Sequence, residues 1–307
     1  MKKFDEISYR LFRQQLGKEI FKIEKYDKPH CVALSGGLDS SCILALYKKT
    51  CTNLRTYSIG LKDWNEFVGA SLVARHFKVK HKNILVTKKQ YEKVCKELIK
   101  KKGEPLQVPN EALLYMIAKQ FSKDIKGKSG VFLSGEGGDE LFGGYTSILD
   151  TVPYKEGNLI ENHIERIVYD KPKWSLWTPG KQRKKYYNIF KNVLKGFEGN
   201  RYDKVQHLLL SLHFPALHQR LRSVELVNGI ALHLPFTDKT WLQLYQILPK
   251  EFRVNKTFLR LIFSRVLPKE VLDAGKIGFP LPLDLKLWQN WNLEIWKTGK
   301  SKIDFWK

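Results

Sequence analysis

Residues 31–42 read Cys-Val-Ala-Leu-Ser-Gly-Gly-Leu-Asp-Ser-Ser-Cys. The apolar run at 32–34 predicts a short buried strand of a parallel sheet. From residue 40 to residue 49, apolar side chains recur at helical spacing, which predicts a helix directly after the turn. A strand, a glycine turn and a helix in this order are typical of a phosphate-binding loop.

The residues of the turn favour an anion as its ligand. Gly36 and Gly37 permit positive φ and let the backbone approach an oxygen anion, and Ser35 and Ser40 can donate hydrogen bonds to it. The pattern is neither a Walker loop nor a dinucleotide fingerprint. A carboxylate beside a phosphate needs a cation between them, so Asp39 is predicted to bind Mg²⁺. The alternative is a strand-turn-helix without a ligand.

A second turn of the same kind follows about a hundred residues later. Residues 131–145 read Val-Phe-Leu-Ser-Gly-Glu-Gly-Gly-Asp-Glu-Leu-Phe-Gly-Gly-Tyr. Ligands of doubly wound α/β sheets collect at the carboxyl ends of the strands, so both turns can face one crevice. Asp39 and Asp139 could then share the metal. Taken alone, residues 134–140 could equally be an acidic loop with glycines for turning.

The two turns together carry a family resemblance. The Ser-Gly-Gly-x-Asp-Ser pattern resembles the pyrophosphate loop of the N-type ATP pyrophosphatases, which cut ATP between its α and β phosphates. With the second turn, the chain resembles the synthetase domain of asparagine synthetases and their β-lactam-forming relatives, over roughly residues 5–290. The resemblance implies a doubly wound parallel sheet of about five strands (adenine nucleotide alpha hydrolase-like) with a helical C-terminal region, and ATP and Mg²⁺ as cofactors.

A third segment, residues 275–280, reads Gly-Lys-Ile-Gly-Phe-Pro and resembles the family segment that delivers a lysine to the triphosphate. A compact ammonium there can neutralise charge on the leaving pyrophosphate. Among 54 basic residues, a lysine near Gly-Phe could also be coincidental. The resemblance implies catalysis by Glu136 and Lys276, nucleotide contacts from Leu34, Ile59, Ser134 and Gly135, pyrophosphate binding by Ser35, Gly36, Gly37, Asp39 and Ser40, and metal binding by Asp39 and Asp139.

The implied reaction is activation of a carboxylate as an acyl-adenylate, with release of pyrophosphate, followed by displacement of AMP by ammonia or an amine. Glu136 agrees with asparagine synthetases, whereas the β-lactam-forming relatives have tyrosine there. Two departures leave the acceptor open: Arg222-Ser223 stands where the family has Asp-Arg, and residues 231–233 read Ala-Leu-His where it has Glu-Ala-Arg. His233 is interpreted as a structural histidine, with substrate contact as the alternative. Aspartate, a surface-polysaccharide sugar acid, a peptide carboxylate and a modified nucleoside remain as acceptors.

We expect three regions along the chain. Residues 1–150 form the ATP-pyrophosphatase α/β core with an N-terminal packing helix, residues 151–200 form a basic, aromatic insertion, and residues 201–307 form the helical part of the same synthetase domain. A glutaminase domain is not expected before the first turn. Ammonia is therefore expected from solution or from a separate glutaminase subunit.

The charge of the chain suggests an alternative function, because the net charge of +23 is larger than the binding of ATP requires. Residues 78–102 carry ten lysines, and residues 171–204 interleave ten basic residues with aromatic ones. Such a mixture can stack bases and track phosphates, so an RNA-modifying (tRNA) enzyme competes with the synthetase. Lysine-rich faces that contact only solvent would give the same sequence pattern. A nucleotide-binding pseudoenzyme is the non-enzymatic alternative.

Two further patterns concern location. The sequence has no apolar run of membrane-spanning length, and its first residues lack the apolar segment of a signal peptide, so we expect a cytoplasmic protein. The four cysteines form no Cys-x-x-Cys pair, which favours reduced thiols over a zinc site.

Overall fold

A computed structural model of the protein describes residues 28–144, 188–189, 191–199, 201–274 and 281–306. The predicted N-terminal packing helix, most of the 151–200 segment and Lys276 lie outside the described residues. No helix in the described ranges is long and apolar enough to cross a membrane.

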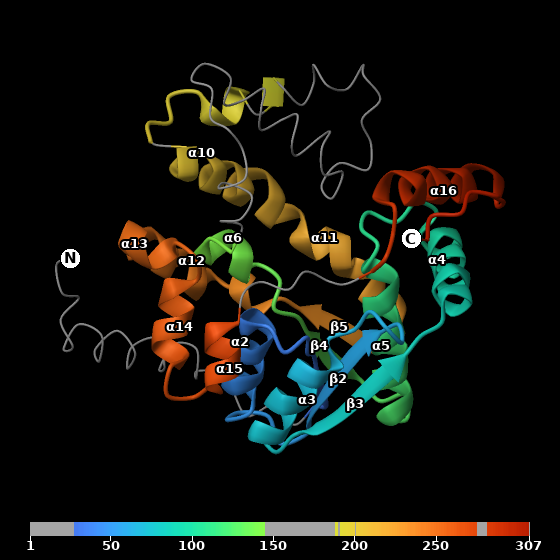
Figure 1. Cartoon of the computed structure of the whole chain (residues 1–307), viewed down its shortest axis with the longest axis horizontal. Coiled ribbons are helices and arrows are strands. Elements are labelled where there is room, and N and C mark those ends of the chain that lie inside the picture. Colours follow the sequence, from blue (N-terminus) through green and yellow to red (C-terminus); the bar gives the residue numbers. More distant parts are fainter. Residues whose placement is uncertain (1–27, 145–187, 190, 200, 275–280, 307) are drawn as a thin grey trace.

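A five-stranded sheet forms the centre of the molecule (Figure 1). The strand order is β3-β2-β1-β4-β5, and every neighbouring pair is parallel. This confirms the predicted α/β fold. The strands are β1 (His30–Ala33), β2 (Leu54–Gly60), β3 (Lys80–Leu85), β4 (Gly130–Leu133) and β5 (Ile230–His233).

The strand order reverses at β1, which pairs with β2 on one side and with β4 on the other. The chain fills one half of the sheet with β2 and β3, then crosses over to β4. Open α/β sheets bind ligands at such a reversal, outside the carboxyl ends of the two strands. In this protein those ends lead into the two glycine-rich turns.

The position of the fifth strand corrects one expectation. We expected about five strands before residue 150, but four lie there and β5 comes from residues 230–233. Ile230 and Leu232 are buried while Ala231 is exposed, so one face of this short strand packs on the core. Four residues are too few for a clear sequence periodicity. The C-terminal part therefore completes the sheet as well as covering it.

Helices surround the sheet. The helices before residue 145 are α2 (Leu38–Tyr47), α3 (Phe67–His76), α4 (Lys88–Lys102), α5 (Glu111–Asp124) and α6 (Gly138–Phe142). The later ones are α10 (Arg201–Leu208), α11 (Leu217–Leu221), α12 (Lys239–Ile247), α13 (Lys250–Arg253), α14 (Thr257–Phe263), α15 (Lys269–Asp273) and α16 (Leu285–Thr298). Short π and 3₁₀ turns link them: η2 (Leu209–His213), η3 (Phe214–Ala216), η4 (Arg222–Leu226) and η5 (Pro235–Thr237).

The C-terminal helices make two groups in space. Helices α14 and α15 contact α2, and α12 to α14 contact α6, so this group packs around the first helices of the two turns (Figure 1). Helix α16 lies apart from them and packs on α4. The confirmed helical C-terminal region thus holds both turns on one side and α4 on the other.

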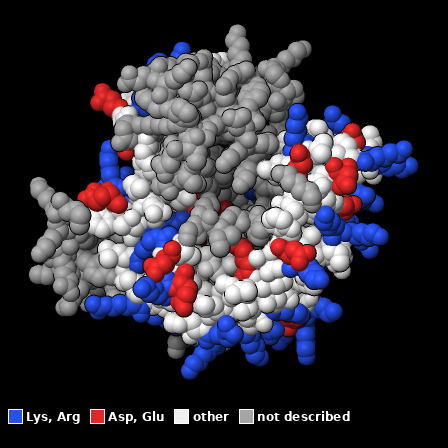
Figure 2. Space-filling view, viewed as in Figure 1, with Lys and Arg blue, Asp and Glu red and all other residues white. Residues whose placement is uncertain are grey.

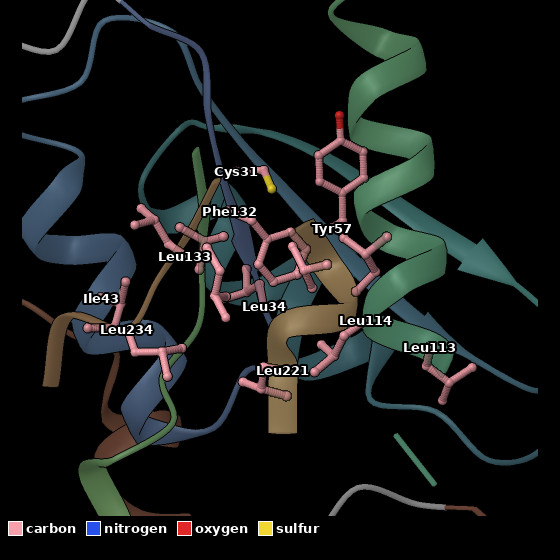
Figure 3. Close-up of a cluster of buried hydrophobic side chains, with 14 of the residues drawn as sticks. Cys31, Leu34, Ile43, Tyr57, Leu113, Leu114, Phe132, Leu133, Leu221 and Leu234 are labelled. Atoms are coloured by element: carbon pink, nitrogen blue, oxygen red, sulfur yellow. The ribbon is translucent and has the colours of Figure 1, made fainter. Parts of the chain in front are cut away.

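One hydrophobic core joins the two parts of the chain (Figure 3). Leu221 and Leu234 from the C-terminal part lie in the same cluster as Phe132 and Leu133 of β4. All four cysteines are buried and free.

Candidate active site

The first turn is shaped by its own hydroxyl groups. Ser35 Oγ and Ser40 Oγ are 3.0 Å apart, the Ser35 amide donates to Ser40 Oγ at 3.2 Å, and the Gly37 amide donates to Ser35 Oγ at 3.1 Å. Helix α2 begins after Gly37, and no side chain caps its first amides. Those amides are the usual donors to a phosphate at a helix N-terminus.

Two glycines allow close approaches around this turn. Gly36 has φ +82°, and a Cβ there would lie 2.4 Å from the backbone carbonyl carbon of Gly69 in α3. A Cβ on Gly135 would lie 2.8 Å from the Ser40 amide nitrogen. The second turn is therefore packed directly against the first, as two turns facing one crevice require.

Asp39 and Asp139 meet where the two turns touch. Asp39 stands in the first turn of α2 and Asp139 in the first turn of α6. Lys256 joins them: its Nζ lies 2.6 Å from Asp139 Oδ1 and donates a hydrogen bond to Asp39 Oδ2. The structure thus brings the two predicted metal-binding carboxylates onto one cation.

Lys256 is only 7% exposed. Burial by itself would lower the pKa of this lysine, but the charges of Asp39 and Asp139 outweigh burial and raise it. The ammonium therefore stays charged. It places one positive charge between two negative ones, inside a site that phosphates would have to enter.

The backbone around Lys256 is tied to the end of α6. Its amide donates to the carbonyl of Phe142 at 2.7 Å, and the amide of Asn255 donates to the carbonyl of Gly143 at 3.2 Å. Both Asn255 and Lys256 have φ near +50°, a conformation that costs a non-glycine residue some strain. These contacts fix the lysine at the turn rather than leaving it on a flexible loop.

The sequence did not predict Lys256 as a site residue. Its partner Asp39 is 217 positions away, and one lysine among 54 basic residues carries no distinctive pattern. The one usable signal was its place directly before the apolar helix 257–263.

The donor set fits Mg²⁺ bound together with phosphates. Carboxylate oxygens are hard ligands, and Mg²⁺ is usually held by one or two of them plus substrate phosphates and water. Across the described part of the chain, no group of three or more His, Cys, Asp or Glu residues could hold a metal alone. Asp39 and Asp139 would therefore need ATP oxygens to complete the coordination of the ion.

The remaining predicted residues lie at the same edge of the sheet. The buried residues Leu34, Ile59 and Ser134 lie at the carboxyl ends of β1, β2 and β4. Glu136 lies partly exposed in the turn between β4 and α6. The catalytic prediction for Lys276 falls outside the described residues.

Two departures from the family pattern have visible partners. His233 accepts or donates at both ring nitrogens, with Tyr47 Oη 3.1 Å from Nδ1 and Asp238 Oδ1 3.1 Å from Nε2, as expected of a structural histidine. Arg222 donates to Glu104 Oε1 at 3.1 Å, beside the segment that precedes α5. An arginine-carboxylate pair therefore stands near the place where the family has Asp-Arg.

Comparisons with known protein sequences agree with the resemblance to asparagine synthetases. The family model for asparagine synthase matches residues 12–299. Asparagine synthetase [glutamine-hydrolyzing] 1 of Bacillus subtilis is 25% identical over 304 residues, which cover 84% of this chain and 47% of that protein. A putative asparagine synthetase [glutamine-hydrolyzing] of Mycobacterium tuberculosis is 25% identical over 322 residues, 91% of this chain and 49% of that protein.

The chain thus spans about half the length of these curated relatives. Among solved structures, it is similar to an NMN synthetase from Francisella tularensis, with a TM-score of 0.36, 15% identity and coverage of 69% of this chain and 95% of that one. The family match extends over both glycine-rich turns, the fifth strand and the C-terminal helices. The chain belongs to the asparagine synthase family.

Proposed function

We propose that the protein is an ATP-dependent amide-forming synthetase of the asparagine synthetase type. It activates a carboxylate as an acyl-adenylate, with AMP and pyrophosphate as the nucleotide products, and ammonia or an amine then displaces AMP. The observation that carries the proposal is the convergence of Asp39, Asp139 and Lys256 where the two glycine-rich turns touch. Two carboxylates for a cation and a lysine for phosphate charge are groups that can bind magnesium pyrophosphate.

Each part of the site has a role in this proposal. Ser35, Gly36, Gly37 and Ser40 bind the pyrophosphate through hydroxyls and helix amides, and Asp39 and Asp139 hold Mg²⁺. When bound, Mg²⁺ neutralises phosphate charge and favours departure of pyrophosphate. Leu34, Ile59, Ser134 and Gly135 line the nucleotide.

The charged residues serve the chemical steps. Lys256 keeps its proton beside both carboxylates and adds a fixed positive charge near the leaving pyrophosphate. Lys276 adds a second charge from the 275–280 segment. Glu136 takes a proton from the attacking ammonium or amine and orients it.

The acceptor is a small carboxylate and the nitrogen comes as ammonia, either free or from a separate glutaminase. The Arg222–Glu104 pair is relevant to the choice of acceptor. Arg222 puts a cation at the position where the family's Asp-Arg pair has its acidic residue. Aspartate and a surface-polysaccharide sugar acid are the two acceptors to compare first.

The test is product formation from α-labelled ATP with Mg²⁺ and ammonium, across aspartate, uronic acids and bulk tRNA. Labelled AMP with one acceptor, lost in Asp39→Asn and Lys276→Ala, is the expected result. Labelled ADP would overturn the proposed mechanism. Binding of ATP without any product, unchanged by these substitutions, would instead support a nucleotide-binding pseudoenzyme.

An RNA substrate is the second candidate, and the exposed lysines of the 78–102 segment favour it. Figure 2 shows lysine and arginine side chains projecting along the lower and right margins of the molecule. The exposed lysines of this segment are Lys78, Lys80, Lys82, Lys88, Lys89, Lys93, Lys96, Lys100 and Lys101.

Salt dependence separates this candidate from the first. If these lysines neutralise RNA phosphates, tRNA affinity should fall about a thousandfold between 50 and 200 mM salt. Substituting three of them, for example Lys89, Lys93 and Lys100, should reduce the salt slope. If tRNA does not bind, or binds with an affinity that does not change with salt, RNA is not the substrate.

A further inference from the structure

A buried chain of polar side chains lies behind the second turn. Glu140 follows Asp139 in α6 and is fully buried. Its Oε1 is 2.6 Å from Nδ1 of His213, a buried residue that ends the π-helix η2. On the other side of the imidazole, the Arg220 guanidinium of α11 contacts His213 Nε2.

Elementary chemistry fixes where the proton of this histidine lies. A guanidinium has donors and no acceptor, so His213 Nε2 must accept from Arg220. The ring proton is then on Nδ1, the nitrogen that faces Glu140 Oε1. The contacts run from the guanidinium of Arg220 through the imidazole to the carboxylate of Glu140, with the ring proton on the side of the carboxylate.

The C-terminal part also holds the backbone of the second turn. Gln206 of α10 donates its side-chain amide to the carbonyl oxygen of Glu140. A Cβ on Gly137, which has φ +98°, would lie 3.1 Å from Cβ of Phe236 and 3.3 Å from Cε2 of Phe214. Side chains from residues 206–236 therefore touch the turn directly.

A buried carboxylate of this kind adds little stability compared with an apolar side chain of the same volume. The neighbours Leu141 and Phe142 show that α6 is otherwise apolar where it is buried. What a buried charged network does provide is a single orientation of the groups attached to it. Here the attached group is the peptide that carries Asp139.

We infer that Arg220, His213 and Glu140 form a positioning chain that fixes the turn carrying Asp139 and thereby sets the affinity of the site for magnesium-bound pyrophosphate groups. The inference rests on the proposed function, because it takes Asp139 as a ligand of Mg²⁺ held by ATP. None of the three residues has to touch the nucleotide. Their effect passes through the main chain between Glu140 and Asp139.

The test measures binding rather than turnover: calorimetric titration of the protein with the Mg²⁺ complex of α,β-methylene-ATP, at several Mg²⁺ concentrations. His213→Leu removes both links of the chain and should weaken binding about ten- to a hundredfold, the usual effect of losing an outer partner of a metal ligand. The apparent Mg²⁺ dependence should move with it.

His213→Asn is the conservative variant. The asparagine amide can donate to Glu140 from the position of Nδ1, so most of the binding should return. A small deficit should remain, because the asparagine loses the contact with Arg220. His207→Leu is the matched control, since His207 of α10 contacts the Val193 carbonyl and stacks on Phe197, away from the turn. Its binding should equal that of the wild type even if its melting temperature falls.

The outcomes separate the two hypotheses. Equal binding by the wild type and His213→Leu would overturn the positioning chain while leaving the proposed function intact. Absence of binding by the wild type would overturn the proposed function itself. If His213→Leu does not fold, Arg220→Met, which removes only the outer link, should weaken binding in the same direction, and unchanged binding there would refute the inference.

Discussion

At the residue scale, Lys256 holds two carboxylates together that would otherwise repel each other. Its replacement by methionine keeps an unbranched side chain, shorter by one atom, and removes the charge. Breaking a buried ion pair from one side costs about 3–5 kcal/mol, so Lys256→Met should be clearly less stable without ligand. Loss of one electrostatic donor should also reduce pyrophosphate release about 10²–10³-fold.

The response to Mg²⁺ gives a second test of the role of Lys256. The ion can replace the lost positive charge between Asp39 and Asp139, so Mg²⁺ with pyrophosphate should raise the melting temperature of Lys256→Met more than that of the wild type. Lys250→Met is the control, because Lys250 is exposed and its pair with Asp203 contributes little. A Lys256→Met enzyme of normal rate and stability would contradict the role given to the lysine.

Glu66 gives a pH-dependent prediction. It immediately precedes α3, whose first turn packs against Gly36, and burial raises the pKa of Glu66 to about 7 from 4.5. Between these values the folded state binds more protons than the unfolded chain, so the free energy of unfolding falls as pH rises from about 4.5 to 7. The loss should be about 1–3 kcal/mol at pH 8.

Glu66→Gln removes this titration. The variant should gain stability relative to the wild type at pH 8 and gain little at pH 4.5, as measured by urea unfolding at both values. Glu251→Gln, an exposed site with the same change of charge, controls for net charge. A stability difference between Glu66→Gln and the wild type that is the same at both pH values would count against the raised pKa.

At the scale of elements, the connection from α4 to α5 is held by a buried ion pair. Lys102 Nζ lies 2.5 Å from Glu111 Oε1, and both side chains are almost completely buried. The other oxygen of Glu111 accepts from the Gln107 amide at 2.9 Å, which fixes the loop between the helices. Asn292 of α16 holds the same loop through both backbone groups of Leu106.

The neighbouring lysine provides a matched comparison. Lys102→Met should cost about 3–5 kcal/mol of unfolding free energy, because Glu111 would stay buried without its cation. Lys101→Met should cost less than about 1 kcal/mol, since its pair with Glu97 is exposed. Chemical denaturation of the two variants decides the question, and equal losses would show that the pair does not hold this connection.

Local patterns explain why much of the sheet and of the site was predictable. Each of the two glycine-rich turns can be recognised in a short stretch of sequence, because the strand, the glycines and the carboxylate are adjacent there. Lys256 and β5 were not predictable in this way. The first acts through partners at positions 39 and 139, and the second is a strand only because β4 offers it an edge. Both depend on the assembled fold.

At the scale of the whole molecule, the shared core joins the regions before and after the 145–187 stretch. Leu221 is 3% exposed and lies in the cluster formed with β4 and α5 (Figure 3). The sheet itself is completed by β5. We therefore predict that residues 28–144 and 201–306 unfold together, in one transition, as parts of the same domain.

Leu221→Ala tests this cooperativity. Removing a buried leucine side chain should cost about 2–5 kcal/mol. If the molecule is one unit, the loss should appear equally in amide exchange of β1 to β3 and in the fluorescence of the tryptophans, five of which lie after residue 240 in the described part. Leu226→Ala, at a 41% exposed site in the adjacent 3₁₀ turn, should change neither. Destabilisation confined to the C-terminal probes would mean that the α/β core stands without β5, and that the Asp39–Lys256–Asp139 contact joins two separately folding parts.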